Sequence, residues 1–132
     1  MRSRSLAGER HLAVDATGLG GVVVELLQQA DLGCRVWPVV ITRSRVASER
    51  NGFCRVPKRE LILGLHGLLE RGELRIAARL GAGAALVREM AEMRTRVTAK
   101  GHEQFGVWRR GEHDDLVLAV ALGCWAAGAK RG

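Results

Sequence analysis

A β-α-β pattern in the first third of the chain restricts the fold more than any other feature. The strand-like run His11 to Asp15 is followed by a glycine-containing turn over residues 17–21. Residues 22–30 have helical apolar spacing, and residues 34–41 carry the β-branched and aromatic side chains of a buried strand. The sequence therefore predicts an α/β fold.

The remaining sequence predicts further elements in alternation. Residues 42–53 lose all periodicity and collect Ser, Arg and Asn, which predicts an exposed loop. The other predicted elements are a helix that begins near Pro57 and ends at Gly72, a brief strand over 74–77, a helix over 84–93, a hairpin of 94–98 with 104–108, and a buried helix over 116–127. We expect one domain over residues 11–127, with a polar lead (1–10) and a polar tail (128–132).

Charge and cysteine usage narrow the choice of partners and compartment. The formal net charge is +7, which favours a polyanion such as nucleic acid, although an arginine-rich coding bias would give the same excess. The isolated thiols Cys34, Cys54 and Cys124 have neither disulfide-framework nor zinc spacing, which fits a reducing cytoplasm. No apolar stretch is long enough to cross a membrane or to serve as a signal core.

Three aspartates lie at the ends of predicted elements, in positions from which carboxylates can bind a metal ion. Asp15 ends the first predicted strand, and Asp114 and Asp115 open the last predicted helix. Carboxylates at a strand end and a helix start can converge at one sheet edge, and hard divalent cations such as Mg²⁺ prefer such oxygen ligands. The structural alternative is that Asp15 forms a turn and Asp114 or Asp115 caps the helix.

Other constellations point less clearly to a function. The turn Gly18 to Gly21 lacks the third glycine of a dinucleotide fingerprint, since Val23 stands there, and no Walker motif is present. No Ser or Cys is placed with His and an acid in a way that indicates a nucleophilic triad. A basic run could follow phosphates or form an ordinary solvated loop; it comprises Arg43, Arg45, Arg50, Arg55, Lys58 and Arg59.

Three sequence blocks together resemble the C-terminal nuclease domain of tailed-phage terminase large subunits. They are Val14-Asp15-Ala16-Thr17-Gly18-Leu19-Gly20, Val56-Pro57-Lys58-Arg59-Glu60-Leu61 and Gly111-Glu112-His113-Asp114-Asp115-Leu116-Val117-Leu118-Ala119. Their order and spacing also fit, from about His11 to Trp125. The His-Asp-Asp-Leu-Val block, which enters an apolar helix, is the most specific part of the resemblance.

This resemblance implies a fold, a chemistry and a set of site residues. The family is similar to ribonuclease H and RuvC resolvases, with a central sheet flanked by helices and clustered acids that hold two Mg²⁺ or Mn²⁺ ions. It cleaves double-stranded DNA during genome packaging. Asp15 matches the second metal-binding acid, and Asp114 and Asp115 match the acidic pair that supplies the third, with His113 supporting them from outside. If the basic run contacts DNA, the residues that we expect to do so by their charge are Arg43, Arg45, Lys58 and Arg59.

The chain departs from the family pattern at its beginning. The family's first acid lies on an earlier strand, whereas no aspartate occurs among residues 1–10, and the motor's ATPase domain is missing. We therefore expect an N-terminally truncated domain, such as a prophage remnant, with a partial ribonuclease H-like sheet whose first strands are missing. The strand that ends in Asp15 would then have an edge without a partner strand. The missing acid leaves open whether the chain alone is an enzyme, and we expect weak or no cleavage.

The implied surroundings are the cytoplasm of a bacterial host and no membrane. The partners would be double-stranded DNA and the missing N-terminal part of the terminase, the portal or the small terminase. Two other functions remain open: a non-catalytic basic module that binds DNA or a packaging partner, and a small nucleotide-binding β-α-β protein.

Overall fold

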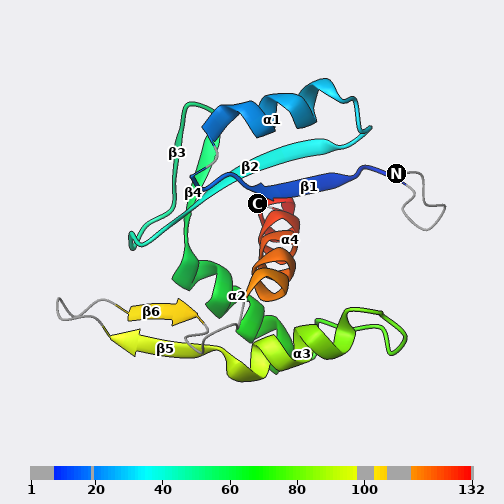
Figure 1. Cartoon of the computed structure of the whole chain (residues 1–132), viewed down its shortest axis with the longest axis vertical. Helices are drawn as coiled ribbons and strands as arrows, with labels where there is room; N and C mark the ends of the chain where they lie inside the picture. Colours follow the sequence, from blue (N-terminus) through cyan, green and yellow to red (C-terminus); the bar gives the residue numbers. More distant parts are fainter. Residues whose placement is uncertain (1–7, 19, 98–102, 107–113, 132) are drawn as a thin grey trace. The chain divides into compact units, whose positions relative to one another are not determined.

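The computed structural model describes residues 8–18, 20–97, 103–106 and 114–131, which form an α/β fold (Figure 1). The elements are β1 (His11–Asp15), α1 (Gly20–Gln29), β2 (Arg35–Thr42), β3 (Ser48–Arg50), β4 (Phe53–Pro57), α2 (Lys58–Glu70), α3 (Gly83–Glu92), β5 (Arg94–Val97), β6 (Glu103–Gly106) and α4 (Asp115–Arg131). None of the helices in these ranges is long and apolar enough to cross a membrane. The prediction of an α/β fold is confirmed.

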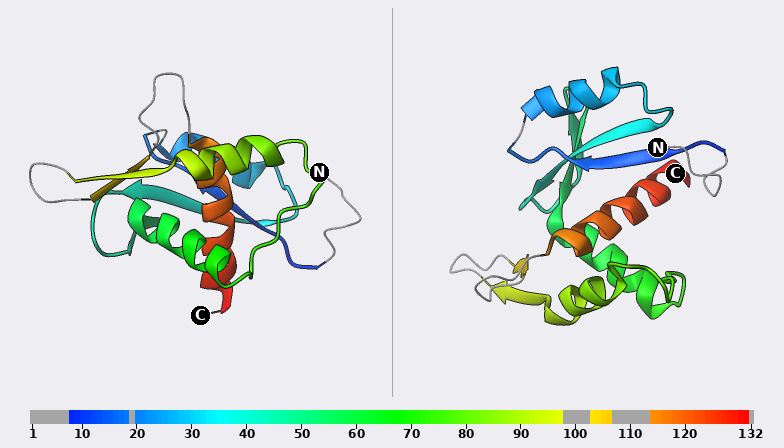
Figure 2. Two further views of the ribbon diagram at one scale, coloured as in Figure 1. Left: turned by 90° about the horizontal axis from the view of Figure 1, so that it is seen from below. Right: turned by 45° about the vertical axis from the view of Figure 1, so that its right-hand side comes forward.

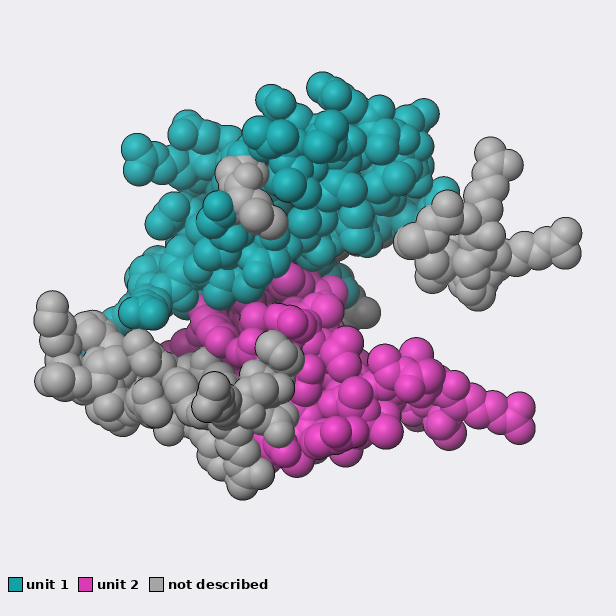
Figure 3. Space-filling view, in the orientation of Figure 1, with its two compact units in different colours: residues 1–57, 126–132 teal, residues 58–125 magenta. Residues whose placement is uncertain are grey.

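The chain divides into two compact units, which are coloured separately in Figure 3. The sheet unit comprises Met1–Pro57 and Ala126–Gly132, and the helical unit comprises Lys58–Trp125. Helix α4 contributes its beginning to the helical unit and its last residues to the sheet unit.

The sheet unit is built on a four-stranded sheet in the order β1-β2-β4-β3 (Figures 1 and 2). Strands β1, β2 and β4 are parallel, and α1 connects β1 to β2 and packs against β2, so the predicted β-α-β pattern is confirmed. The register aligns Asp15 with Val39 and Val39 with Cys54. Because the strands are parallel, Asp15, Thr42 and Pro57 end them at the same edge of the sheet.

Strands β3 and β4 form a tight antiparallel ribbon where the sequence predicted a loop over residues 42–53. Asn51 and Gly52 make the turn with positive φ angles of 53° and 81°, the geometry that an Asn-Gly hairpin turn requires. The prediction of a continuous loop is wrong for residues 48–53, which pair as a ribbon. The strand Ser48–Arg50 carries no apolar alternation, so the Asn51-Gly52 pair is the sequence signal for it. Strand β1, at the other end of the order, pairs only with β2 among the described residues.

The helical unit contains α2, α3, the β5–β6 hairpin and the first part of α4. The predicted helices and hairpin pairing are confirmed, with Arg94 opposite Gly106 at one end of the hairpin. The burial predicted for residues 116–127 holds along one side of α4 only, since Ala119, Gly123 and Ala127 are exposed. The buried side chains of this unit lie on three helices, in stripes that follow helical spacing: Leu61, Ile62, Leu65, Leu86, Val117, Ala121 and Leu122.

The strand predicted over residues 74–77 is wrong. Residues 73–77 have no strand partner within the described ranges. Leu74 and Ile76 are half-buried while Arg75 and Ala77 are exposed, so the alternation is real. It reflects a non-helical segment packed on one side rather than a member of a sheet.

Candidate functional site

Asp15 lies at the end of β1, where the chain turns toward α1. Its Oδ1 accepts a hydrogen bond from the Thr17 N–H at 2.9 Å. The turn is joined to β2, because the Ala16 N–H donates to the Val39 carbonyl at 2.8 Å and the Ile41 N–H donates to Thr17 Oγ1 at 2.9 Å. Asp15 therefore does form a turn, as the structural alternative predicted. A carboxylate offers about four lone-pair positions, so this bond leaves an exposed acceptor available at the sheet edge.

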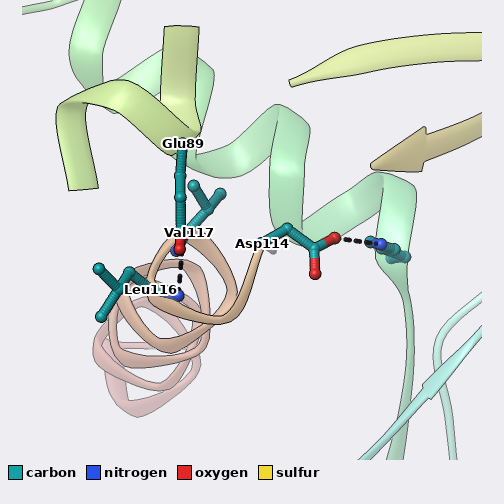
Figure 4. Close-up of polar contacts among 5 residues, drawn as sticks. Glu89, Asp114, Leu116 and Val117 are labelled. Carbon is teal, nitrogen blue, oxygen red and sulfur yellow. Dashed lines mark hydrogen bonds and ion pairs between the residues drawn. The ribbon is translucent and has the colours of Figure 1, made fainter. Parts of the chain in front are cut away.

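Asp114 stands at the N-cap position of α4, in the helical unit. Its carbonyl accepts the first helical bond, from the Leu118 N–H at 3.0 Å. A residue at this position ordinarily uses its own side chain to accept the N–H groups two and three residues farther along. Here those groups, on Leu116 and Val117, have a different acceptor (Figure 4).

Glu89 of α3 is that acceptor. Its Oε2 lies 3.0 Å from the Leu116 nitrogen and 3.0 Å from the Val117 nitrogen. The Glu89 side chain points toward the start of α4 (Figure 4). The carboxylate meets the positive end of the helix dipole and satisfies two N–H groups that the helix itself leaves unbonded. The prediction that Asp114 caps the helix with its side chain is therefore replaced by a cap from another helix.

Released from capping, the Asp114 carboxylate pairs with Lys58, the first residue of α2. The Lys58 Nζ lies 2.7 Å from Asp114 Oδ2, and the two side chains are 28% and 22% exposed. A short, partly buried ion pair is held more firmly than a surface pair. Lys58, which the sequence assigned to DNA contact, is thus a counterion for one of the predicted metal ligands.

The other predicted site residues divide between the two units. Asp115 is exposed at the first position of α4, next to Asp114. Arg43 and Arg45 are exposed in the sheet unit, and Arg59 is exposed in the first turn of α2. His113 lies outside the described residues.

The three predicted metal ligands are divided between the two units. Within either unit, the described residues include no group of three His, Cys, Asp or Glu side chains that could hold a metal ion. Carboxylates are the donors that Mg²⁺ and Mn²⁺ prefer, so the chemistry of Asp15, Asp114 and Asp115 fits these ions. Their meeting at one ion stays a prediction, since Asp15 belongs to one unit and the other two to the other.

The basic loop after β2 begins at the same sheet edge as Asp15. Thr42 Oγ1 lies 2.8 Å from Ser44 Oγ, and the Ser44 hydroxyl donates to the Val46 carbonyl at 3.1 Å. These contacts hold the backbone around Arg43 and Arg45 while both arginines stay exposed. The loop can therefore present positive charge to a phosphate near the carboxyl ends of the strands.

The cysteines are free and two of them are poor nucleophiles at neutral pH. Burial raises the pKa of the Cys54 thiol above its ordinary 9.0; Glu49 raises it too, and Arg35 lowers it in part. Burial also raises the pKa of the Cys124 thiol. A thiol must ionise before it attacks or binds a metal, so neither residue is prepared for such a role.

Comparison with known proteins identifies a shared fold. No family model matches the chain, and no curated protein sequence matches it. The structure is similar to the crystal structure of the large terminase nuclease from thermophilic phage G20c, which contains bound cobalt. The TM-score is 0.61 with 23% sequence identity over 87% of this chain. The chain spans about half, 52%, of that nuclease chain. This likeness supports the kind of domain that the three sequence blocks predict.

Proposed function

We propose that this chain is a part of a phage terminase large-subunit nuclease domain with a ribonuclease H-like sheet. Its inherited function is metal-dependent endonucleolytic cleavage of double-stranded DNA during genome packaging. One observation carries the proposal. The fold likeness to a large terminase nuclease extends over 87% of the chain, and the chain carries an aspartate at the end of β1 and two at the start of α4.

Asp15, Asp114 and Asp115 would hold the metal, which we propose to be Mg²⁺ or Mn²⁺. The bound cobalt of the similar nuclease supports a divalent cation of this kind. Two such ions would activate a water and stabilise the leaving oxygen of the phosphodiester. The chain's own residues prepare the ligands: Thr17 orients Asp15, and Glu89 relieves Asp114 of helix capping.

We propose that cleavage by this chain alone is weak or absent. The family's first acid has no counterpart among residues 1–10, and fewer carboxylates hold two cations close together less well. Lys58 further reduces the negative charge by its pairing with Asp114. His113 would support the acidic pair from outside.

DNA is the proposed substrate, and exposed basic residues are its proposed contacts. Arg43 and Arg45 follow β2 at the Asp15 edge, and Lys58 and Arg59 begin α2. Each of the three exposed arginines could neutralise a phosphate and release a bound counterion, whereas the partly buried Lys58 would first have to leave Asp114, with which it pairs at 2.7 Å. The missing N-terminal part of the terminase, the portal and the small terminase are the proposed protein partners, in the cytoplasm of a bacterial host.

A plasmid-nicking assay tests the proposal. The protein would be restored by adding an upstream strand with an aspartate, and incubated with supercoiled plasmid and Mn²⁺. We expect nicking that a chelator abolishes and that Asp15→Asn or Asp115→Asn also abolishes. Glu25→Gln, an exposed change on α1, is the matched control and should retain activity. Nicking that is absent from the restored protein, or insensitive to both Asn variants, would contradict the proposal.

The second candidate is a non-catalytic basic module that binds DNA or a packaging partner. The ion pair between Lys58 and Asp114 favours it, because a residue already bound by an ammonium group is a weaker metal ligand. A salt-sensitive gel shift by the restored protein, without nicking at any Mn²⁺ concentration, would support this candidate.

A further inference from the structure

The β3–β4 ribbon has two chemically different faces. Its register places Ser48 opposite Arg55, Glu49 opposite Cys54 and Arg50 opposite Phe53. Residues directly opposite each other in an antiparallel pair share a face, and successive residues alternate. One face therefore carries Arg50 and Arg55 as diagonal neighbours, while the acid of the ribbon, Glu49, lies on the other face.

A second observation agrees with this assignment of faces. The Glu49 carboxylate contributes to the raised pKa of Cys54, which requires the two groups to be near each other. Glu49 is therefore directed away from the arginines and does not neutralise them. Among the described residues, neither Arg50 nor Arg55 has an ion-pair partner, and both are exposed.

The arginines stand on a backbone that is already ordered. The two-residue turn at Asn51 and Gly52 fixes the register of β3 against β4, and β4 is also paired along its other side with β2. A charged face on such a ribbon loses little backbone entropy when a ligand binds. It can therefore offer two guanidinium groups at a fixed spacing.

The ribbon lies in register with the strand that carries Asp15. Asp15, Val39 and Cys54 form one row across β1, β2 and β4, and Arg55 follows Cys54 directly. Two strand spacings separate β1 from β4, which is about 10 Å. Because successive strand residues point to opposite faces, Arg55 lies on the opposite face of the sheet from Asp15, and the arginine pair would contact phosphates other than the one at that carboxylate.

We infer that the Arg50–Arg55 face of the β3–β4 ribbon binds the phosphate backbone of double-stranded DNA. Guanidinium groups match phosphate oxygens and are always charged. The inference rests on the proposed function, which it deepens by extending the basic surface from the loop residues Arg43 and Arg45 onto the ribbon. The contact is to phosphates and is independent of base sequence.

A structural role for the same charges makes a different prediction. Strand β3 has one partner in the described sheet, and charged residues on such an edge prevent pairing with another chain. If edge protection were their only role, removing the arginines would promote self-association and leave DNA binding unchanged.

The test measures the salt dependence of DNA binding by fluorescence anisotropy, with a labelled duplex and a chelator present so that no cleavage occurs. The variants are Arg50→Gln, Arg55→Gln and the double change. Arg79→Gln is the matched control, because Arg79 is exposed and belongs to the helical unit, whereas the ribbon belongs to the sheet unit. Circular dichroism verifies that each variant is folded.

Each lost phosphate contact lowers the magnitude of the slope of log K against log salt by about 0.9. We expect a decrease of about 1.8 for the double variant and affinity lower by about eightfold per arginine at 0.1 M salt, by the same relation. Arg79→Gln should match the unmodified chain. An unchanged slope in the double variant, or an equal loss in Arg79→Gln, overturns the inference. Either result would leave the proposed function untouched, because metal-dependent nicking by the restored protein tests that function separately.

Discussion

The cap that Glu89 provides for α4 can be tested by removing its carboxylate. Glu89→Ala deletes the acceptor of both the Leu116 and the Val117 N–H groups. Loss of an N-cap costs about 1 kcal/mol, and loss of a negative charge at a helix N-terminus costs about 0.3–1 kcal/mol more. Because the side chain is half-buried, we expect the free energy of unfolding to fall by about 2 kcal/mol.

The variant Glu89→Gln separates the charge from the hydrogen bonds. It keeps a carbonyl oxygen as acceptor but loses the interaction with the helix dipole, so it should lower the free energy of unfolding by about 0.5–1 kcal/mol. Glu25→Ala, at an exposed position on α1, should change it by less than about 0.5 kcal/mol.

Urea unfolding followed by circular dichroism measures these differences. With a slope of about 2 kcal/mol per molar urea, a loss of about 2 kcal/mol lowers the midpoint by about 1 M without changing the slope. The reasoning is refuted if Glu89→Ala and Glu89→Gln both unfold within about 0.2 M of the unmodified chain. It is also refuted if Glu25→Ala is as destabilising as Glu89→Ala.

Four further predictions concern the turn, an exposed glycine of α2, the core and the thiols. Gly52→Ala should lower the free energy of unfolding by about 1 kcal/mol in urea denaturation. A Cβ at Gly52 would meet no atom within 4 Å, so the cost comes from the backbone φ of 81°. Gly64→Ala, in an open helical position, should raise the free energy of unfolding by a few tenths to about 1 kcal/mol. Leu61→Ala should lower it by about 3 kcal/mol, since that side chain is 1% exposed, and a loss below about 1 kcal/mol would contradict its place in the core. The rate of alkylation of Cys54 and Cys124 by iodoacetamide should have its pH midpoint above 9.0 in the folded chain and near 9.0 in the chain unfolded by urea. Because the thiols of the unfolded chain ionise at lower pH, the free energy of unfolding should fall as pH rises past 9.0. Equal midpoints in the two solvents would exclude the raised pKa values.

The elements that periodicity could predict were those with an apolar face. Residues 22–30, 84–93 and 116–127 were expected as helices and are helical over most of their lengths. Strand β3 could not be predicted from periodicity, because its three residues are Ser, Glu and Arg and it has no apolar face. Its pairing with β4 depends on the turn rather than on burial. The Asn-Gly pair was the available signal for that ribbon.

The sequence predicted the acidic residues of the candidate site but not the residues that contact them. The places of Asp15 and Asp114 follow from a strand end and a helix start, which local sequence indicates. The role of Glu89 depends on how α3 packs beside α4, and no spacing within either helix specifies it. Lys58 was assigned to DNA by its charge alone, and only its 2.7 Å contact with Asp114 shows what it binds.

Addition of Mn²⁺ during nuclear magnetic resonance spectroscopy of the ¹⁵N-labelled chain tests most directly whether the carboxylates of the two units share a cation. A small fraction of an equivalent should broaden the amide signals of Ala16 and Thr17 together with those of Asp115 and Leu116. Asp15→Asn should then weaken the broadening at both places. Broadening confined to one group, or unchanged at Asp115 in Asp15→Asn, would contradict a common metal site.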